Sequence, residues 1–168
     1  MGVPQPVRLP VVRPATAQDL PAALELFDQL DRFQHGWRVF EPRATLRQEA
    51  EARYRAALMD PDVLHVVAEV DGRVVGTALA KAHPISSMSD EVVAELSGVM
   101  VHPDHRALGV GRALVAEVGR WAAGRGVRRV AIKTYSANEE ALRFWEGLGF
   151  EPRLVQMTAL AEDLAAKA

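Results

Sequence analysis

A loop containing arginine and glycine is the feature that most constrains the fold of this chain. The loop spans residues 106–111, reads Arg-Ala-Leu-Gly-Val-Gly, and follows an apolar run that ends at Val101. After it, Leu114, Val118 and Trp121 recur at helical spacing. Glycines let the backbone approach a ligand closely, and the first turn of a helix offers amide donors without intrahelical partners. The sequence therefore predicts a strand–loop–helix unit that binds an anion.

The residues around this loop favour a pyrophosphate and exclude two other glycine-rich phosphate loops. Arg106 and Arg112 can complete a pyrophosphate site, because guanidinium groups bind phosphate in a bidentate way. A dinucleotide-binding loop needs a third glycine where Leu114 stands, and an acid after the next strand at 130–134. A nucleoside-triphosphate loop needs four residues between its glycines and a Gly-Lys-Ser/Thr ending, which are absent here.

Apolar periodicity predicts alternating strands and helices along the rest of the chain. Strands are expected over residues 7–13, 64–70, 74–80, 91–101, 130–134 and 154–160, and helices over about 16–30, 42–57, 109–124 and 138–149. Asp71-Gly72 predicts a tight hairpin, whereas residues 84–90 have loop composition. Thr16 and Asp19 have the spacing of a capping box, and Asn138 is typical of a helix N-cap. The pattern predicts one mixed α/β domain over residues 1–168.

Composition excludes several classes of function. The 168 residues contain no cysteine, which removes disulfides, thiolate metal sites and a cysteine nucleophile. His102 and His105 form His-x-x-His, but no third ligand has suitable spacing, so no metal site is predicted. Twenty basic and 22 acidic side chains predict neither a nucleic-acid partner nor a membrane partner, and no apolar stretch is long enough to span a membrane. Residues 1–6 lack the pattern of a signal peptide, so we expect a cytoplasmic protein.

Together with the loop, a second motif resembles the GNAT superfamily of acetyl-CoA-dependent N-acetyltransferases. Residues 138–150 fit the family pattern Asn-x-x-Ala-x-x-Phe-Tyr-x-x-x-Gly-Phe, with Trp145 in place of the tyrosine. The resemblance covers nearly the whole chain. It implies a GNAT-like α/β fold with a central mixed, mostly antiparallel sheet of six to seven strands, flanked by about four helices. It also implies transfer of an acetyl group from acetyl-CoA to a primary amine, by direct attack in a ternary complex.

The resemblance implies a set of cofactor contacts. In GNAT proteins the strand before the loop pairs with the pantetheine arm, which here implies the backbone of Met100 and Val101, with Val99 beside them. The pyrophosphate contacts implied by the family fall on Arg106, Ala107, Leu108, Gly109, Val110, Gly111, Arg112 and Ala113. Asn138 corresponds to a position near the thioester, and Trp145 to an aromatic residue beside the arm. A helix cap and a core aromatic are the structural alternatives for these two residues.

The catalytic acid and base are less defined than the cofactor site. The indole of Trp145 cannot replace the acid that the family's tyrosine supplies. The proton for the leaving thiolate is then expected from Tyr135, from water or from the ammonium group of the substrate. Glu95 is the candidate general base because it interrupts an otherwise apolar strand. A solvent-facing or ion-paired glutamate is the alternative interpretation, and His83, Asp90 and Glu91 are weaker candidates.

The acceptor and the oligomeric state are not determined by these motifs. Trp37, Phe40 and Tyr54 fall where GNAT proteins form the acceptor wall, and ordinary core packing explains them equally well. The acceptor is expected to be a small-molecule amine or a protein amine. Because members of the family often dimerise, a homodimer is a further expectation. The alternative function is an acetyl-CoA-binding module of GNAT fold with little or no transfer activity, in a regulatory or sensing role.

Overall fold

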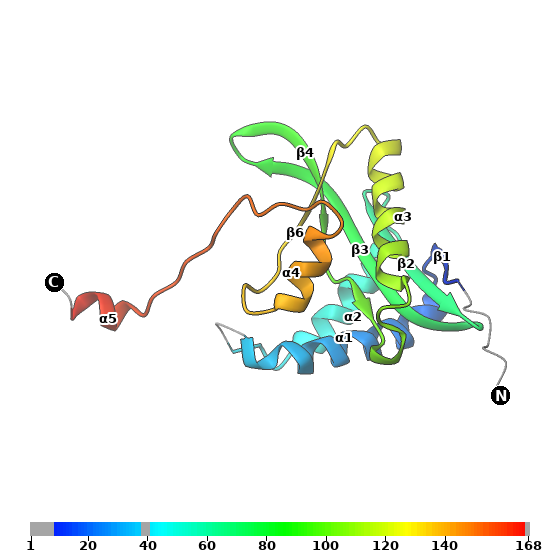
Figure 1. Ribbon diagram of the computed structural model, residues 1–168, viewed down its shortest axis with the longest axis horizontal. Helices are drawn as coiled ribbons and strands as arrows, with labels where there is room; N and C mark the ends of the chain where they lie inside the picture. Colours follow the sequence, from blue (N-terminus) through cyan, green and yellow to red (C-terminus); the bar gives the residue numbers. More distant parts are fainter. Residues whose placement is uncertain (1–8, 38–40, 167–168) are drawn as a thin grey trace.

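The computed structural model describes residues 9–37 and 41–166, and an open six-stranded sheet lies at its centre (Figure 1). The strands are β1 (Val11–Pro14), β2 (Val63–Val70), β3 (Arg73–Ser86), β4 (Ser89–Leu96), β5 (Met100–Val101) and β6 (Arg129–Ile132). Their order is β1-β2-β3-β4-β6, and β5 pairs with β3. Every pair is antiparallel except β4 with β6, which is parallel. The expected mixed, mostly antiparallel sheet is confirmed.

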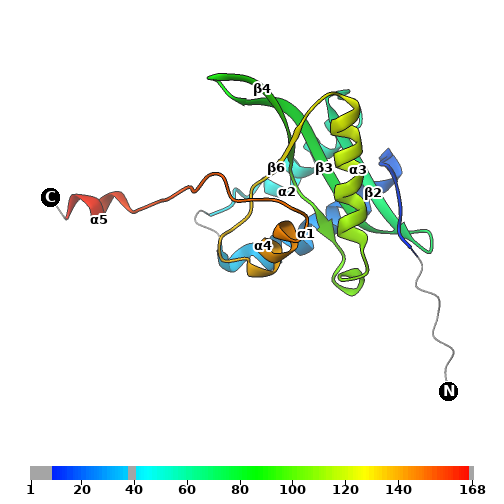
Figure 2. The same cartoon turned by 45° about the horizontal axis from the view of Figure 1, so that its top comes forward.

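In the described part of the chain, five α-helices and three short 3-10 turns accompany the sheet. The α-helices are α1 (Leu20–Gln34), α2 (Leu46–Ala57), α3 (Val110–Gly124), α4 (Glu139–Glu146) and α5 (Ala161–Ala165), and the 3-10 turns cover Ala17–Asp19, His35–Trp37 and Pro103–His105. In both views α3 lies along the sheet (Figures 1 and 2). Among the described residues, no helix combines the length and the apolar character needed to cross a membrane.

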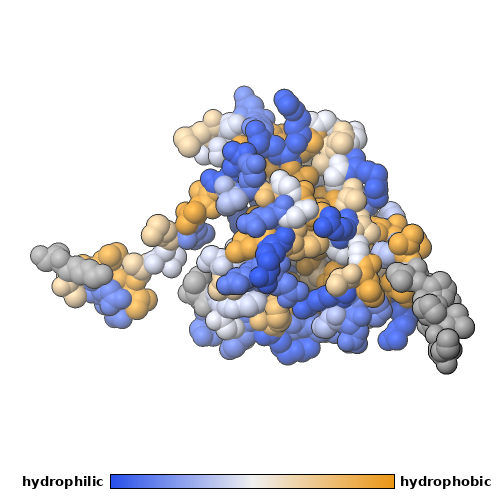
Figure 3. All heavy atoms as spheres, viewed as in Figure 1, coloured by the Kyte–Doolittle hydropathy of each residue, from blue (hydrophilic) through white to orange (hydrophobic). Residues whose placement is uncertain are grey.

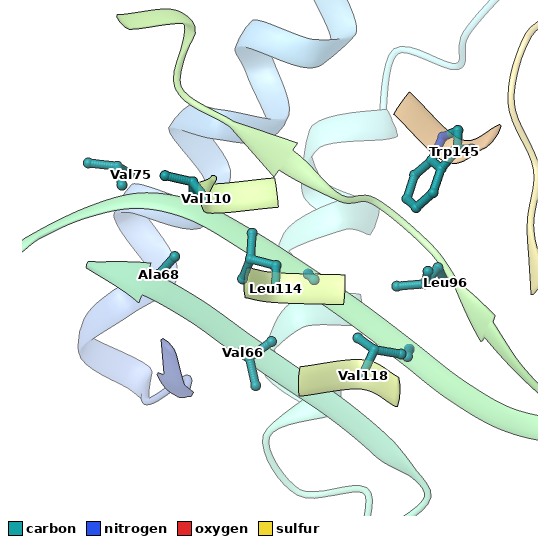
Figure 4. Close-up of a cluster of buried hydrophobic side chains, with 10 residues drawn as sticks. Val66, Ala68, Val75, Leu96, Val110, Leu114, Val118 and Trp145 are labelled. Carbon is teal, nitrogen blue, oxygen red and sulfur yellow. The ribbon is translucent and has the colours of Figure 1, made fainter. Parts of the chain in front are cut away.

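Alternation of side chains along β2 and β3 produces two cores, one on each face of the sheet. Val66, Ala68 and Ala78 pack with Leu114 and Val118 of α3 on one face (Figure 4). On the other face the strands pack against α1 and α2 through a second set of apolar residues that includes Leu24, Ala50, Tyr54, Leu79 and Met100. Strands β2 and β3 are therefore covered on both faces, and β5, which leads into the loop before α3, pairs with β3.

Two local predictions are confirmed at the ends of elements. The Asp19 carboxylate accepts a hydrogen bond of 2.7 Å from the Thr16 amide, as expected for a capping box. Asp71 and Gly72 both have positive φ, at 53° and 74°, and they join β2 to β3 as a tight hairpin turn. These features depend only on neighbouring residues, so their sequence pattern is sufficient.

The prediction of a loop over residues 84–90 is wrong. Strand β3 continues to Ser86 and pairs with Ser89 at the start of β4. A bulge between Pro84 and Ser86 accommodates the missing amide of the proline. A hairpin needs only backbone hydrogen bonds, so a serine-rich stretch with loop composition can still form its ladder.

The single strand expected over residues 91–101 is divided in two. Both β4 and β5 pair with β3: Leu96 lies opposite Ala80, and Met100 lies opposite Thr77. The chain advances three residues from Thr77 to Ala80 but four residues from Leu96 to Met100. One extra residue is therefore inserted in the segment 97–99, as in a β-bulge. The insertion separates β5 from β4 at the point where the functional loop begins.

The last predicted strand is absent. Residues 151–160 form no regular structure, every one of them is exposed, and the chain then forms the short helix α5. We call residues 151–166 the C-terminal arm. In Figures 1 and 2 the arm projects away from the sheet. The run 154–160 has strand composition but no strand beside it, so its backbone is unpaired.

Candidate active site

Strands β4 and β6 form one side of the sheet and are paired over only four residues each. Their parallel pairing runs from Val93 opposite Arg129 to Leu96 opposite Ile132, and it ends there. Beyond that point β5 pairs only with β3 in the part of the chain that the structure describes. The edge of Met100 and Val101 that faces away from β3 therefore carries backbone groups available to an extended ligand.

The loop before α3 exposes a series of backbone amides. Ala107 and Gly109 have positive φ, at 59° and 82°, and the first helical bond runs from the Ala113 amide to the Gly109 carbonyl at 3.0 Å. Among the described residues, no backbone carbonyl accepts from the amides of 107–112. Left-handed residues alternating with ordinary ones turn successive amides towards a common point, which is the geometry of an anion-binding nest. The loop is thus suited to a pyrophosphate.

Gly111 has a packing role that the sequence interpretation missed. A Cβ atom at Gly111 would lie 3.1 Å from Cζ of Phe144 and 3.8 Å from Cγ2 of Val101. The absence of a side chain lets Phe144 on α4 pack against the first turn of α3 and beside β5. The two motifs of the sequence therefore meet at this contact, and their joint occurrence was the available signal.

Arg106 connects the loop to the end of α1. Its guanidinium carbon lies 5.0 Å from the ring centroid of Phe33, within the range of a cation–π interaction. Phe33 in turn packs edge-to-face on Trp37, with the centroids 5.0 Å apart. Trp37 therefore lies near the loop, Phe40 lies outside the described residues, and Tyr54 is in the core. Sequence periodicity gave no indication that Phe33 holds Arg106.

Asn138 is a helix cap and Trp145 is a core aromatic residue, which are the structural alternatives given above for these two residues. Asn138 is buried, and its Oδ1 accepts a hydrogen bond of 3.0 Å from the Ala141 amide, which caps α4. Trp145 is only 8% exposed and packs edge-to-face with Phe144 and Phe150. Little of its surface is therefore available to a ligand, and a contact with the cofactor arm stays a prediction for both residues.

Tyr135 lies in the connection between β6 and α4, downstream of the point where β4 and β6 separate. It is half-buried, and its carbonyl accepts a hydrogen bond of 3.0 Å from the Asn138 amide. This bond fixes the backbone of Tyr135 relative to the cap of α4. Its role as an acid remains a prediction.

Each carboxylate oxygen of Glu95 has a side-chain partner, Lys133 on one and His83 on the other. Its Oε1 lies 2.8 Å from Nζ of Lys133 and its Oε2 lies 2.7 Å from Nε2 of His83. These contacts, with Lys133 as the largest cause, lower the pKa of Glu95 below its ordinary value, although partial burial opposes them. Nδ1 of His83 lies 2.7 Å from the Pro84 carbonyl oxygen, which holds the ring beside Glu95. Glu95 is therefore a partly buried carboxylate that is ionised at neutral pH.

The other acidic candidates lie at the opposite end of β4. Asp90 and Glu91 are in its first residues, far along the strand from β5, and Glu91 forms an ion pair of 2.5 Å with Arg129. With Val92, Gly126 and Arg128 these residues line an open surface pocket of about 590 Å³. The structure does not bring Asp90 or Glu91 to the loop before α3.

The two histidines of His-x-x-His face each other at the start of that loop. Their rings pack edge-to-face with centroids 5.6 Å apart, and Nδ1 of His102 accepts a hydrogen bond of 3.3 Å from the Asp104 amide. Among the described residues, there is no group of three or more histidines and acids placed to hold a metal ion.

A buried polar group that the sequence did not indicate supports β5 from behind. The ring of His65 stacks on Tyr54, and its Nε2 lies 3.0 Å from Oγ1 of Thr77. That hydroxyl donates its own hydrogen to the Val66 carbonyl, so Nε2 of His65 must be the donor to Thr77. Burial lowers the pKa of His65 to about 4 and raises that of Tyr54 to about 12. The Tyr54 hydroxyl approaches Sδ of Met100 at 4.0 Å, which links this neutral group to β5.

Comparison with known proteins places this arrangement in a family. Residues 26–150 match the Acetyltransferase (GNAT) family. An uncharacterised N-acetyltransferase of Methanocaldococcus jannaschii is 31% identical over 145 residues, which cover 86% of this chain and 62% of that protein. The aminoglycoside N(6')-acetyltransferase type 1 of Salmonella typhimurium is 32% identical over 87 residues, 51% of this chain and 60% of that protein. The chain therefore spans less than two thirds of the length of these relatives.

A solved structure agrees with the sequence matches. The acetyltransferase of Trypanosoma brucei superposes with a TM-score of 0.63 at 26% identity, covering 89% of this chain and 98% of that one. The match to the family extends over most of the chain and includes both motifs. This protein belongs to the GNAT family of acetyltransferases.

Proposed function

We propose that this chain is an N-acetyltransferase that moves an acetyl group from acetyl-CoA to a primary amine. The observation that carries the proposal is the juxtaposition of two unpaired backbone surfaces. These are the free edge of β5 and the open amides between Ala107 and Arg112 at the start of α3. An extended polar arm and a pyrophosphate are the two parts of acetyl-CoA that these surfaces suit.

The cofactor would bind along the loop and the strand together. The amides of Leu108 to Ala113 would hold the pyrophosphate with Arg106 and Arg112, while the peptide groups of the pantetheine arm would pair with β5. Phe33 would keep Arg106 directed at the phosphates through its cation–π contact. The thioester end would then lie where β4 and β6 separate, beside Glu95 and Tyr135.

The transfer would proceed by direct attack within the ternary complex. The amine nitrogen forms a bond to the acetyl carbon, the carbon–sulfur bond breaks, and CoA leaves as the thiolate. Backbone amides near the bulge would polarise the carbonyl oxygen as charge develops there. The sequence contains no cysteine that could form an acylated thiol, which favours direct transfer to the amine.

Two protons must move during this reaction. Glu95 would accept the proton that the attacking ammonium group has to lose, and its ionised state at neutral pH supports this role. The proton that reaches the thiolate would come from Tyr135 or from water. Because its ion pairs lower its pKa, Glu95 would be a weak base that matters most when the amine itself is largely protonated.

We propose a small-molecule amine or a protein amine as the acceptor. The similarity to a protein named aminoglycoside N(6')-acetyltransferase supports the small-molecule class. A panel of amino sugars, polyamines, amino acids and peptides, assayed by release of the CoA thiol and by the mass of acetylated products, tests the proposal. Turnover on at least one amine is expected; binding of acetyl-CoA with no turnover on any acceptor would contradict it.

Glu95→Gln tests the general base, with Glu91→Gln as the matched control. Both residues lie on β4, and both are ion-paired, but Glu91 is at the far end of the strand. Glu95→Gln should lower kcat/KM about 10²-fold or more at low pH and less at high pH, where the amine is already neutral. Glu91→Gln should leave the pH profile unchanged. A loss in Glu95→Gln that does not depend on pH would assign Glu95 a structural role.

Gly109→Ala tests the cofactor loop, and Gly126→Ala controls for backbone strain. Both glycines have positive φ, at 82° and 73°, and neither has a neighbouring atom within 4 Å of an added Cβ. Each substitution should therefore cost about 1 kcal/mol of folding free energy. Only Gly109→Ala should also weaken acetyl-CoA binding measured by calorimetry. Equal affinities in the two variants would contradict the loop assignment.

A second candidate function is an acetyl-CoA-binding module with little transfer activity. It is favoured by Trp145, which replaces the family's tyrosine and is buried in the core rather than presented to a ligand. This candidate predicts that calorimetry detects acetyl-CoA binding that depends on Gly109, while the amine panel yields no acetylated product. The same two measurements therefore separate the two functions.

A further inference from the structure

Lys133 places a primary ammonium group on the candidate base. It directly follows β6, and its Nζ lies 2.8 Å from Oε1 of Glu95. The side-chain amine of a lysine is itself a primary amine, which is the class of acceptor proposed above. An ammonium acceptor has to come within hydrogen-bond distance of Glu95 to lose its proton there. The chain therefore holds one of its own amines where an external acceptor would be activated.

The register of the sheet fixes this contact. Glu95 lies opposite Ala131 in the parallel pair of β4 and β6, and residues 131 and 133 point to the same face of a strand. The pairing ends at Ile132, so Lys133 is the first residue beyond the point where the two strands are joined. The thioester end of the cofactor is proposed to lie at this same place.

The lysine is exposed, whereas its partner is partly buried. The side chain of Lys133 is 87% exposed, and that of Glu95 is 25% exposed. Figure 3 shows hydrophilic side chains over α4, the helix that follows Lys133 in the chain. An ion pair with one exposed partner is weak, and a lysine side chain is long and flexible. The amine can therefore give its proton to Glu95 and then turn towards a neighbouring acyl group.

Lys81 provides a comparison within the same molecule. It lies opposite Glu95 in the β3–β4 register and is 55% exposed, but its Nζ lies 3.5 Å from Asp60. Lys167, the third lysine of the sequence, is outside the described residues. Of the two lysines in the described part of the chain, Lys133 is the one that is paired with Glu95.

We propose that Lys133 is an acetylation site of this chain: without an amine substrate, the acetyl group of bound acetyl-CoA is transferred to Nζ of Lys133 in the same molecule. The bond between Nζ and the acetyl carbon forms as the carbon–sulfur bond breaks. One proton passes from Nζ to Glu95 and on to water, and a second goes to the thiolate, which leaves as CoA. Because the step consumes acetyl-CoA bound at the loop before α3, the inference rests on the function proposed above.

Acetylation of Lys133 would change the base beside it. An acetylated lysine is neutral and no longer forms an ion pair. Lys133 is the largest cause of the lowered pKa of Glu95, so the modification raises this pKa towards its ordinary value. It also frees Oε1 of Glu95 for the ammonium group of an external amine. The acid limb of kcat/KM for such an amine should therefore move to higher pH after the modification.

Incubation of the full chain with acetyl-CoA and no amine tests the proposal, with peptide mass mapping to locate the acetyl group. We expect one acetyl group at Lys133, formed about 10²-fold faster than at Lys81, because only Lys133 contacts the base. The rate constant should not depend on protein concentration. Lys133→Arg keeps the positive charge and should remove the modification, whereas Lys81→Arg should not. Equal modification of both lysines, or a rate constant that rises with protein concentration, would overturn the proposal.

Two further variants show whether the modification uses the candidate active site. Gly109→Ala should slow it by weakening the binding of acetyl-CoA, and Glu95→Gln should slow it about 10²-fold by removing the base. Gly126→Ala and Glu91→Gln are the matched controls and should leave its rate unchanged. Circular dichroism confirms that each variant is folded. Modification of Lys133 at the wild-type rate in both Gly109→Ala and Glu95→Gln would mean that acetyl-CoA reacts from solution, and this result would reject the proposal.

The amine panel separates this inference from the proposed function. If external amines are acetylated while Lys133 stays unmodified, the inference is wrong and the proposed function is retained. If calorimetry detects no binding of acetyl-CoA, the proposed function is wrong, and the inference fails with it because Lys133 then has no bound acetyl donor.

Discussion

Strand β2 and the C-terminal arm are similar in sequence and opposite in structure. Both contain short runs of β-forming apolar residues, at 63–70 and 154–160. Strand β2 has β1 and β3 on its two edges and helices on both faces, so its central side chains are fully buried. The arm has no strand beside it, and all its residues are exposed. The difference shows that strand composition becomes strand structure only where a complementary edge and a covering layer are present.

The largest contrast is expected when the same charge is placed in the two regions. Val66 is 1% exposed, so Val66→Asp should destabilise the chain by about 4 kcal/mol or more, because the carboxylate loses its hydration without a partner. Val155→Asp should change the free energy of unfolding by about 0.5 kcal/mol or less at concentrations where the chain is monomeric. Urea denaturation at low protein concentration measures both. Equal losses would mean that the arm is packed in solution.

The buried histidine of β2 should make stability depend on pH. The pKa of His65 is lowered to about 4, so between about pH 6.5 and 4 the unfolded chain binds a proton that the folded chain does not. This difference removes about 3 kcal/mol of stability as the pH falls through that window, and it adds nothing above it. His65→Phe should flatten this part of the stability profile measured by urea denaturation. An unchanged slope in the variant would show that other groups cause it.

Asp19 should add to the acid sensitivity at lower pH. Its pKa is held well below the ordinary value, chiefly by the hydrogen-bonded ion pair with Arg13. The stability that this pair contributes is present above the unfolded carboxyl value and is lost as the pH falls through the folded one. The slope caused by His65 lies at higher pH, so the two contributions can be separated.

A side chain added within the sheet should lower the free energy of unfolding by an intermediate amount. A Cβ on Gly76 in β3 would lie 2.9 Å from Cγ1 of Val110 and 3.1 Å from the Met100 carbonyl oxygen. Gly76→Ala should therefore cost about 1–3 kcal/mol through overpacking between β3, β5 and α3. Ala159→Val adds volume to the exposed arm and should cost nothing measurable in dilute solution. A tolerated Gly76→Ala would show that α3 can shift from the sheet.

The smallest effect is expected at the partly buried carboxylate of Glu95 on β4. Lys133→Gln removes the main cause of the lowered pKa of Glu95, so Glu95 becomes protonated at a higher pH. If Glu95 is the base, the acid limb of kcat/KM should move to higher pH. Lys81→Gln is the control, because Lys81 lies opposite Glu95 in the β3–β4 register but pairs with Asp60. An acid limb that moves equally in both variants, or in neither, would contradict the role of Glu95.

Features of the fold that depend on neighbouring residues were predictable from the sequence. The Asp71-Gly72 turn, the Thr16 and Asp19 capping box and the Asn138 cap are all found as expected. The alternation of β2 and β3 and the helical spacing of α3 also led to the correct elements and core positions. The two motifs were sufficient to identify the family.

The composition of the candidate site was only partly predictable. The sequence indicated the loop before α3, but it gave no sign that Phe33 contacts Arg106 or that Gly111 accommodates Phe144. It proposed Glu95 as a lone carboxylate, whereas the structure pairs it with Lys133 and His83. These partners come from other strands and helices, so no local pattern relates them.

The sequence by itself determined the turns, the caps, the faces of the elements and the amide-rich loop, because backbone conformation and side-chain periodicity act over a few residues. The tertiary structure alone decided where the ladder is interrupted near Gly98, which polar groups are buried behind β5, and whether an apolar run is paired. Burial and strand pairing depend on surfaces that meet from distant parts of a chain, or from a second one. For the run 154–160, the sequence defines a strand, and only the available edge determines whether that strand forms.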